Sequence, residues 1–369
     1  MRGVAPVKRG GGKGWMIAAI VLAVLLVLTV LGGILSVMGS VLGVLAGANP
    51  AAMSSDSMLQ EITLENNGSS YKIAVVPVEG LILGGGLGAS RGDVVHLIRD
   101  QLKLAGRDKR VKAVLLRVNS PGGEVLASDE IYKAIEEFQK EHKKPVVAAM
   151  GSLAASGGYY VSAPCRWIVA NELTITGSIG VIMHTYNYRG LMNKVGLRPL
   201  VFKSGRFKDM LSGEKDLEKL TPQEKTDFEQ EEAMIQKMIG ETFGRFKQVV
   251  GEGRKRANDE NKANPGDAAG RSLAPSWADY ADGRILSGRE AYEHGFVDEL
   301  GDTQTAIKRA RTLVGIDDAN LVTYRPPFGL SDLFGFLGKS EMKSIKVDWG
   351  FDIPKLQAGL YYLAPSFLR

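Results

Sequence analysis

The chain has 369 residues, of which 44% are hydrophobic and 24% are charged, and this length is sufficient for one large or two small domains with a buried core. A single cysteine excludes an intrachain disulfide framework and any metal site built from several cysteines, and four histidines without an HExxH pair argue against a zinc hydrolase. The net charge of +5 comes largely from basic residues before residue 14, so the rest of the chain is nearly neutral and gives no reason to expect a nucleic-acid partner.

The first strong pattern in chain order is an uncharged, apolar run over residues 15–48. It is longer than the roughly 20 residues that a helix needs to cross a bilayer, and longer than the apolar part of a signal peptide, about 7–15 residues. Because basic residues precede it, the positive-inside rule predicts a single-pass anchor in the cell membrane, with residues 1–14 as a cytoplasmic tail and the remainder extracytoplasmic. A cleaved signal peptide is the alternative, since residues 46–48 are small.

Residues 49–70 are rich in serine, asparagine and glycine and indicate a linker. Apolar strands then alternate with helical patterns over residues 71–315, which predicts an α/β fold with a largely parallel sheet. The expected helices are 93–105, 128–141 and about 155–163, and the expected strands are 73–78, 111–118, 146–150, 168–170, 179–183 and 200–202.

A capping box at residues 221–224 opens a long helix that we expect to end near residue 250. Residues 251–276 are polar and predict a loop or an insertion within the domain. Residues 283–314 return to a compact α/β pattern. The tail, residues 316–369, has no clear period, and its sequence predicts no role.

Two glycine-containing segments follow predicted strands and are candidates for chemistry. The first, Asn-Ser-Pro-Gly-Gly at residues 119–123, comes directly after the strand expected at 111–118. A turn of this kind can leave backbone N–H groups unpaired and directed outward, which is the geometry of an oxyanion hole. An ordinary turn between a strand and a helix is the alternative for this segment by itself.

The second segment is Ala-Ala-Ser-Gly-Gly at residues 154–158, which follows a predicted strand and begins a helix of small residues. It resembles a degenerate nucleophile elbow around Ser156, in which Ala154 replaces the first glycine of G-x-S-x-G. Gly157 and Gly158 permit a close approach of substrate backbone, and the helix N-terminus favours a developing negative charge. A serine that only caps the helix is the alternative.

A nucleophilic serine needs a base. The histidines have no acidic partner in a triad-like pattern, although an esterase that uses Ser156 with His184 or His294 remains an alternative. The other source of a base is a lysine, and Lys203 and Lys208 both follow a predicted strand. A lysine has an ordinary pKa of about 10.4, so basic catalysis near neutrality requires a decrease of roughly 3 units, which desolvation can provide. A solvated surface position is the alternative for each lysine.

Five segments together resemble the signal peptide peptidase A (protease IV) family, and they occur in the family's order. They are NSPGG at 119–123, SLAASGGYY at 152–160, TGSIG at 176–180, KSGRFKD at 203–209 and GRILSGREA at 283–291. The resemblance covers roughly residues 71–315. It implies a Clp-protease/crotonase-like fold of repeated β-β-α units, preceded by one transmembrane helix.

The resemblance also implies a role for each site residue. Ser156 matches the nucleophile, Lys208 matches the general base, and Ser178 matches the hydroxyl that orients the lysine. The backbone N–H groups of Gly123 and Gly157 match the oxyanion hole, and no metal or organic cofactor is required. The implied activity is that of a membrane-anchored serine endopeptidase that cleaves hydrophobic peptides, such as signal peptides already released from their proteins.

The short form of this family has one serine block and one lysine block, as this chain does. The resemblance therefore implies a homo-oligomer, for example an octamer, in which neighbouring subunits share each active site. Two other classes of function stay open. A crotonase-type acyl-CoA enzyme would need an acidic base and a CoA site, and a catalytically silent membrane scaffold would be expected to lack Ser156 or Lys208, both of which are present.

Overall fold

The computed structural model describes residues 59–85, 94–263 and 270–327, the backbone of residues 360–363, and the isolated positions Leu22 and Thr29. The chain divides into two compact units, Met1–Met58 and Leu59–Arg369. The predicted cytoplasmic tail and transmembrane segment therefore lie outside the described residues except for those two isolated positions. Within the part of the chain that is described, no helix is both long enough and apolar enough to cross a bilayer.

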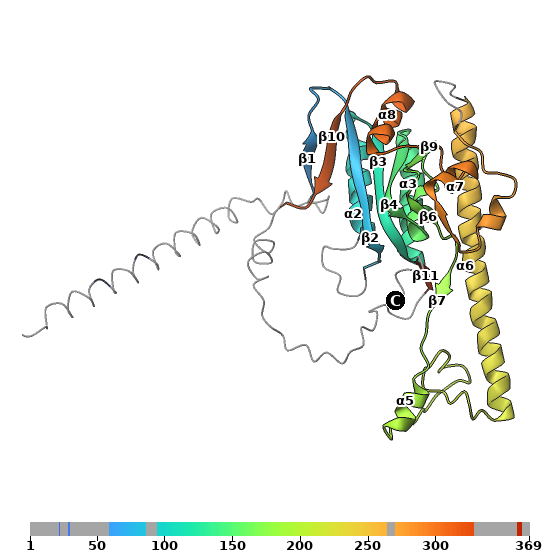
Figure 1. Cartoon of the computed structure of the whole chain (residues 1–369). Helices are drawn as coiled ribbons and strands as arrows, with labels where there is room; N and C mark the ends of the chain where they lie inside the picture. Colours follow the sequence, from blue (N-terminus) through green and yellow to red (C-terminus); the bar gives the residue numbers. More distant parts are fainter. Residues whose placement is uncertain are drawn as a thin grey trace, which may run out of the picture. The chain divides into compact units, whose positions relative to one another are not determined.

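A largely parallel sheet forms the centre of the second unit (Figure 1). Its strands are β1 (Gln60–Glu65), β2 (Lys72–Ile82), β3 (Val111–Glu124), β4 (Val146–Ala154), β5 (Trp167–Ala170), β6 (Ile175–Gly177), β7 (Ile182–Met183), β8 (Ile285–Ser287), β9 (Glu299–Leu300), β10 (Asn320–Arg325) and β11 (Leu360–Leu363). The main order is β1-β10-β2-β3-β4-β5-β9, in which only β1 is antiparallel to its neighbour. The predicted α/β fold with a largely parallel sheet is confirmed.

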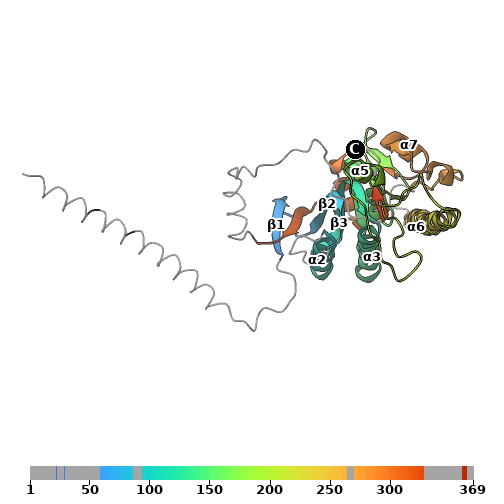
Figure 2. The same cartoon turned by 90° about the horizontal axis from the view of Figure 1, so that it is seen from below.

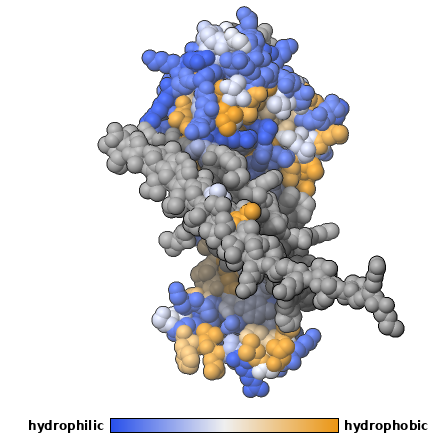
Figure 3. Space-filling view, turned by 90° about the vertical axis from the view of Figure 1, so that its left-hand side faces the viewer, coloured by the Kyte–Doolittle hydropathy of each residue, from blue (hydrophilic) through white to orange (hydrophobic). Residues whose placement is uncertain are grey.

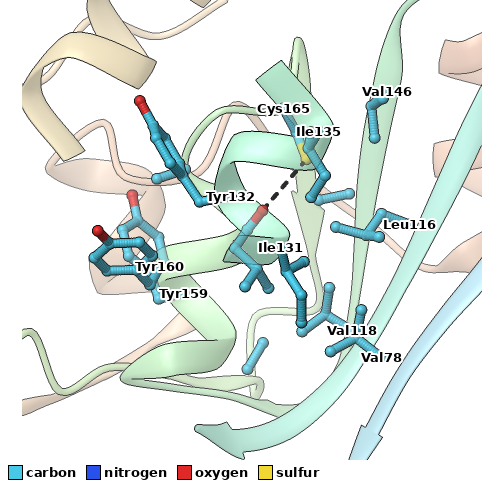
Figure 4. Packing of buried hydrophobic residues seen from close by; sticks show 14 of the residues in the cluster. Val78, Leu116, Val118, Ile131, Tyr132, Ile135, Val146, Tyr159, Tyr160 and Cys165 are labelled. Atoms are coloured by element: carbon cyan, nitrogen blue, oxygen red, sulfur yellow. Dashed lines mark hydrogen bonds between the residues drawn. The ribbon is translucent and has the colours of Figure 1, made fainter. Parts of the chain in front are cut away.

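Helices cover both faces of this sheet. The helices of the described residues are α2 (Val94–Arg107), α3 (Val125–His142), α4 (Gly157–Ser162), α5 (Arg189–Lys194), α6 (Pro222–Ala263), α7 (Gly288–Glu293), α8 (Thr303–Val314) and the 3-10 helix η2 (Trp277–Tyr280), and among them α5 lies apart from the sheet (Figure 1). On one face α2 and α3 lie side by side (Figure 2), and Ile131 and Ile135 point toward Val118 and Leu116 of β3 (Figure 4). On the other face α8 packs near Leu115. Because successive strand residues point to opposite faces, the continuous apolar run of β3 fills both layers of the core.

β3 continues through the Asn-Ser-Pro-Gly-Gly segment directly into α3, so the turn predicted at residues 119–123 was wrong. The pairing of β3 with β2 shifts register between Glu79 and Leu81, and its pairing with β4 shifts between Val118 and Ser120. Such irregularities bend a strand without ending its pairing. They bring the glycines to the carboxyl edge of the sheet, beside the ends of β2 and β4.

α6 begins where the sequence predicts and ends later than expected. The Glu224 carboxylate accepts a hydrogen bond from the Thr221 N–H at 2.8 Å, and the Thr221 hydroxyl accepts one from the Glu224 N–H at 3.3 Å. This is the predicted capping box. The helix then runs for 42 residues, well past residue 250.

The loop predicted over residues 251–276 was wrong for residues 251–263, which continue α6. Three polar side chains of this segment are buried, those of Arg254, Asn258 and Asn261. Arg254 pairs with Asp298, both side chains are fully enclosed, and Arg254 also donates to the Cys165 carbonyl at 3.0 Å. A charge can be buried when it is paired and hydrogen-bonded, so local polarity did not indicate exposure here.

Three other boundaries differ from the sequence analysis. Residues 200–202 form no strand and are exposed, although they are apolar. β1 lies within the expected linker 49–70, and β10 lies within the expected tail 316–369. These two strands pair with each other, and β10 also pairs with β2. The pairing partners are distant in sequence, and no local pattern records them.

Candidate active site

Ser156 lies at a strained turn between β4 and α4. Its backbone angles are φ 54° and ψ −117°, which are costly for any residue with a side chain. The residue is 1% exposed, and its hydroxyl has no hydrogen-bond partner among the described residues. Buried polar groups almost always have a partner, and strained residues cluster at functional sites. The pattern therefore fits a poised nucleophile better than a helix cap, since α4 has no cap bond from this side chain.

The Thr-Gly-Ser segment holds the turn around Ser156 in place. The Ser156 N–H donates to the Gly177 carbonyl at 2.8 Å, and the Thr176 hydroxyl donates to the Ala154 carbonyl at 2.7 Å. Ser178 follows directly, is 3% exposed and has a left-handed backbone with φ 49°. The structure therefore brings the segment that carries Ser178 beside Ser156.

Two predicted oxyanion donors also meet at this point. A Cβ placed on Gly157 would lie 3.1 Å from the Gly123 nitrogen and 3.0 Å from the Gly122 Cα. A Cβ placed on Gly123 would lie 1.9 Å from the Ile82 carbonyl oxygen, so only glycine fits there. Gly122 differs from these two, because its N–H donates to the Ser120 hydroxyl at 3.0 Å. The backbones of Gly123 and Gly157 thus lie together next to Ser156.

α4 is fixed to its surroundings by two tyrosines, whose side chains are seen in Figure 4. The Tyr159 hydroxyl donates to the Phe296 carbonyl at 2.9 Å, and the Tyr160 hydroxyl donates to the Asp129 carboxylate at 2.7 Å. Burial raises the pKa of Asp129, but the hydrogen bonds from Lys133 and Tyr160 and the nearby charge of Arg245 outweigh it and lower that pKa below its ordinary value. The helix that begins at the candidate nucleophile is therefore firmly anchored.

A strand from the C-terminal part of the same chain lies along this site. β11 pairs antiparallel with Gly122, Gly123 and Glu124 of β3, and also with β7. It contacts α4 as well. An extended segment can therefore bind by main-chain pairing across the glycines beside Ser156, which is the way that many proteins bind peptides at a strand edge. No pattern in the sequence of residues 360–363 predicted this strand.

Lys208 lies in a different part of the chain from Ser156. It belongs to residues 184–221, which we call the extended lobe and which project beyond the carboxyl ends of the strands between β7 and α6 (Figure 1). Lys208 is exposed, and its amine forms no ion pair or hydrogen bond within the described ranges. Lys203 is different, because its amine pairs with Asp209 at 2.8 Å. Desolvation raises the pKa of Asp209, but the hydrogen bond from Lys203 and the charge of Lys215 lower it overall.

The histidines do not supply a base in this structure. No described side chain bonds to the Ser156 hydroxyl. The ring of His184 packs against Tyr186, and the ring of His294 packs against Tyr280. Within the described ranges there is also no group of three histidine, cysteine, aspartate or glutamate side chains that could bind a metal ion.

A strained serine on a parallel sheet, with backbone amides at its side, is the arrangement of serine hydrolases that attack carbonyl groups. Comparison with known proteins narrows this class. The family model described as Peptidase family S49 matches residues 138–266. A protein of Enterococcus faecium named "Putative signal peptide peptidase SppA" is 37% identical over 284 residues, which cover 76% of this chain and 74% of that protein. The chain belongs to peptidase family S49, and it is a serine-type endopeptidase.

Two further relatives agree with this assignment. The chloroplastic serine protease SPPA of Arabidopsis thaliana is 28% identical over 77% of this chain and 39% of its own length. Protease 4 of Haemophilus influenzae is 34% identical over 68% of this chain and 36% of its own length. The resemblance to signal peptide peptidases that the sequence motifs indicated is thereby confirmed at the level of the family.

Proposed function

We propose that this protein is a membrane-anchored endopeptidase with a Ser–Lys dyad that cleaves hydrophobic peptides such as released signal peptides. Ser156 is the nucleophile and Lys208 is the general base, with Ser178 orienting the lysine. The N–H groups of Gly123 and Gly157 bind the oxyanion. The observation that carries the proposal is the environment of Ser156 beside these two glycines. Its backbone is strained, and its hydroxyl is buried and has no hydrogen-bond partner among the described residues.

The base comes from a second copy of the chain. Lys208 is exposed on the extended lobe, and Ser156 has no partner in its own described protomer. The lobe also exposes many apolar side chains, which gather at its surface in Figure 3. They include Tyr186, Leu191, Val195, Leu197, Leu200, Val201 and Phe202. An exposed apolar surface of this kind is typical of a protein interface, and an interface between unlike faces of identical subunits closes into a ring.

The chemistry then follows from the two side chains and the backbone. Enclosure by the neighbouring subunit removes water from the lysine, which favours the neutral amine. That amine takes the proton of Ser156 as the serine oxygen attacks a peptide carbonyl, and the two glycine N–H groups stabilise the tetrahedral oxyanion. The lysine next protonates the leaving amine and finally activates the water that hydrolyses the acyl-enzyme. No metal or organic cofactor takes part in these steps.

The expected substrate is an extended, apolar peptide. β11 supports this because it pairs with β3 and β7 as an antiparallel strand at the site. Apolar side chains are exposed near the same edge, with Leu81 of β2 39% exposed and Leu126 of α3 67% exposed. Peptides left in the membrane after signal cleavage have this composition, and residues 15–48 would hold the enzyme near them.

Mixing two inactive variants tests the proposal. We expect Ser156→Ala and Lys208→Ala each to lose hydrolysis of unstructured peptides while keeping the fold. When the two are unfolded, mixed equally and refolded together, about a quarter of the sites should combine an intact serine with an intact lysine from the neighbour. Recovery of about a quarter of the wild-type activity, with a multimeric mass in solution, supports a shared dyad. Full activity of either variant alone would exclude the dyad, and a mixture without activity would exclude sharing.

A further inference from the structure

Ser120 contacts both backbone segments of the candidate oxyanion hole, the one that contains Gly123 and the one that leads to Gly157. It lies in β3 immediately before the Pro-Gly-Gly sequence and is completely buried. Its hydroxyl accepts a hydrogen bond from the Gly122 N–H at 3.0 Å. Its carbonyl accepts a second one from the Ala155 N–H at 3.1 Å, one residue before Ser156. One residue thus contacts both the glycine segment of β3 and the turn that carries the nucleophile.

The packing between these two segments leaves no room for independent movement. A Cβ on Gly158 would lie 2.7 Å from the Ser120 carbonyl oxygen, and a Cβ on Gly157 would lie 3.0 Å from the Gly122 Cα. Both distances are to backbone atoms, which cannot rotate away as the end of a side chain can. A change in the direction of the glycine segment therefore changes the position of the turn as well.

The Ser120 hydroxyl also restricts the peptide that carries the Gly123 N–H. Pro121 has no N–H, so the hydroxyl holds the first N–H of the segment, that of Gly122. Gly122 has φ 102°, and because glycine has no Cβ its backbone can adopt many other conformations. Without the hydroxyl, the buried Gly122 N–H would lose its partner, and the segment could rotate to find another.

We propose that Ser120 is a positioning residue that directs the Gly123 N–H toward the oxyanion formed at Ser156. The inference rests on the proposed function, because it assumes that Ser156 is the nucleophile and that Gly123 is an oxyanion donor. Ser120 does not touch the reacting atoms. Loss of its hydroxyl should therefore raise the free energy of the transition state without changing the binding of the substrate.

The test compares Ser120→Ala with Ser162→Ala in the full-length protein. Ser162 is a matched control, since it is also completely buried and donates to a backbone carbonyl, that of Gly158, at 2.8 Å. The measurements are kcat and KM with an unstructured peptide, and the inhibition constant of a peptide aldehyde, whose adduct with Ser156 places an oxygen in the oxyanion hole. We expect Ser120→Ala to lower kcat by about 10- to 100-fold with little change in KM. The inhibition constant of the aldehyde should rise by a similar factor.

Ser162→Ala should change neither kcat nor the inhibition constant of the aldehyde by more than about threefold. Ser120→Thr keeps the accepting hydroxyl and should recover much of the loss. Ser120→Cys keeps the shape of serine with a weaker acceptor, so it should fall between serine and alanine and also serves if Ser120→Ala does not fold. Equal loss in Ser120→Ala and Ser162→Ala, or unchanged aldehyde binding by folded Ser120→Ala or Ser120→Cys, would overturn the inference.

Adduct formation by the wild-type protein distinguishes a failure of the Ser120 proposal from a failure of the proposed function. If the wild-type chain forms no aldehyde adduct at Ser156, located by mass spectrometry, then the assignment of the nucleophile fails and the inference fails with it. If the wild-type chain forms the adduct and folded Ser120→Ala forms it equally well, then only the role of Ser120 is refuted.

Discussion

Gly123 offers a direct test of the packing at the site, because a methyl group there meets backbone and not a movable side chain. In Gly123→Ala the new Cβ would lie 1.9 Å from the Ile82 carbonyl oxygen and 2.7 Å from the Ile82 nitrogen. Cβ atoms essentially never approach atoms of other, non-adjacent residues closer than 3.0 Å. The ends of β2 and β3 must therefore separate by about 1 Å, since close-packed interiors leave no free space.

We expect two effects of different size from this change. Overpacking should lower the free energy of unfolding by about 1–3 kcal/mol, measured by chemical denaturation. A displacement of about 1 Å of the Gly123 N–H should lower kcat by about 100-fold, measured with a fluorogenic peptide. KM should change much less, because an oxyanion donor acts on the transition state.

Gly251→Ala is the matched control. A Cβ there would meet the Trp277 ring at 3.5 Å, which is an ordinary contact, and the residue lies inside α6. This variant should gain about 0.5–1 kcal/mol of stability because alanine favours a helix more than glycine does, and its kcat should not change. A folded Gly123→Ala protein with wild-type kcat would refute the assignment of the Gly123 N–H to the oxyanion hole.

Three further predictions follow from other parts of the structure. Removing residues 356–369 should lower KM for unstructured peptides several-fold, because a tethered β11 competes with substrate for β3 and β7; an unchanged KM would mean that β11 does not occupy the substrate position. Arg254→Met should cost about 3–5 kcal/mol of unfolding free energy, because it leaves the buried Asp298 carboxylate without its charged partner, and adding Asp298→Leu should recover part of this loss; additive losses in thermal melts would contradict the pairing. The lowered pKa of Asp129 means that its contribution to stability is complete above about pH 4 and is lost as the pH falls through the folded pKa; Asp129→Asn should therefore flatten the acid limb of the stability curve, and an unaltered acid limb would exclude this contribution.

The parts of the site that are local in sequence were predictable. The strand, the small residues and the serine at 154–158 are neighbours along the chain, so their pattern indicates a turn from strand to helix that carries a nucleophilic serine. The approach of Gly123 to Gly157 follows from the topology, because β3 and β4 are parallel neighbours and their carboxyl ends lie at the same edge of the sheet.

Features that depend on distant pairing were not predictable from the sequence. The contact of Ser120 with Ala155 lies at a register shift between β3 and β4 that no periodicity records. The polar composition of residues 251–276 predicted a loop or an insertion. Arg254 in this segment instead pairs with Asp298, which lies 44 residues further along the chain. β11 is only four residues long and pairs with strands more than 170 residues away, so its local signal is negligible.

α6 connects the extended lobe, which contains Lys208, to the body of the protein. A helix of 42 residues spans about 63 Å, and its buried positions lie mainly after Phe246, where it packs on the body of the protein. In the half of α6 that follows the extended lobe, only Glu231 is buried among the described residues. If the serine and the lysine of each site come from separate copies, as proposed, a single protomer holds neither a complete site nor a fully supported lobe. Activity would then rise with the concentration of the protein, because assembly would complete the site.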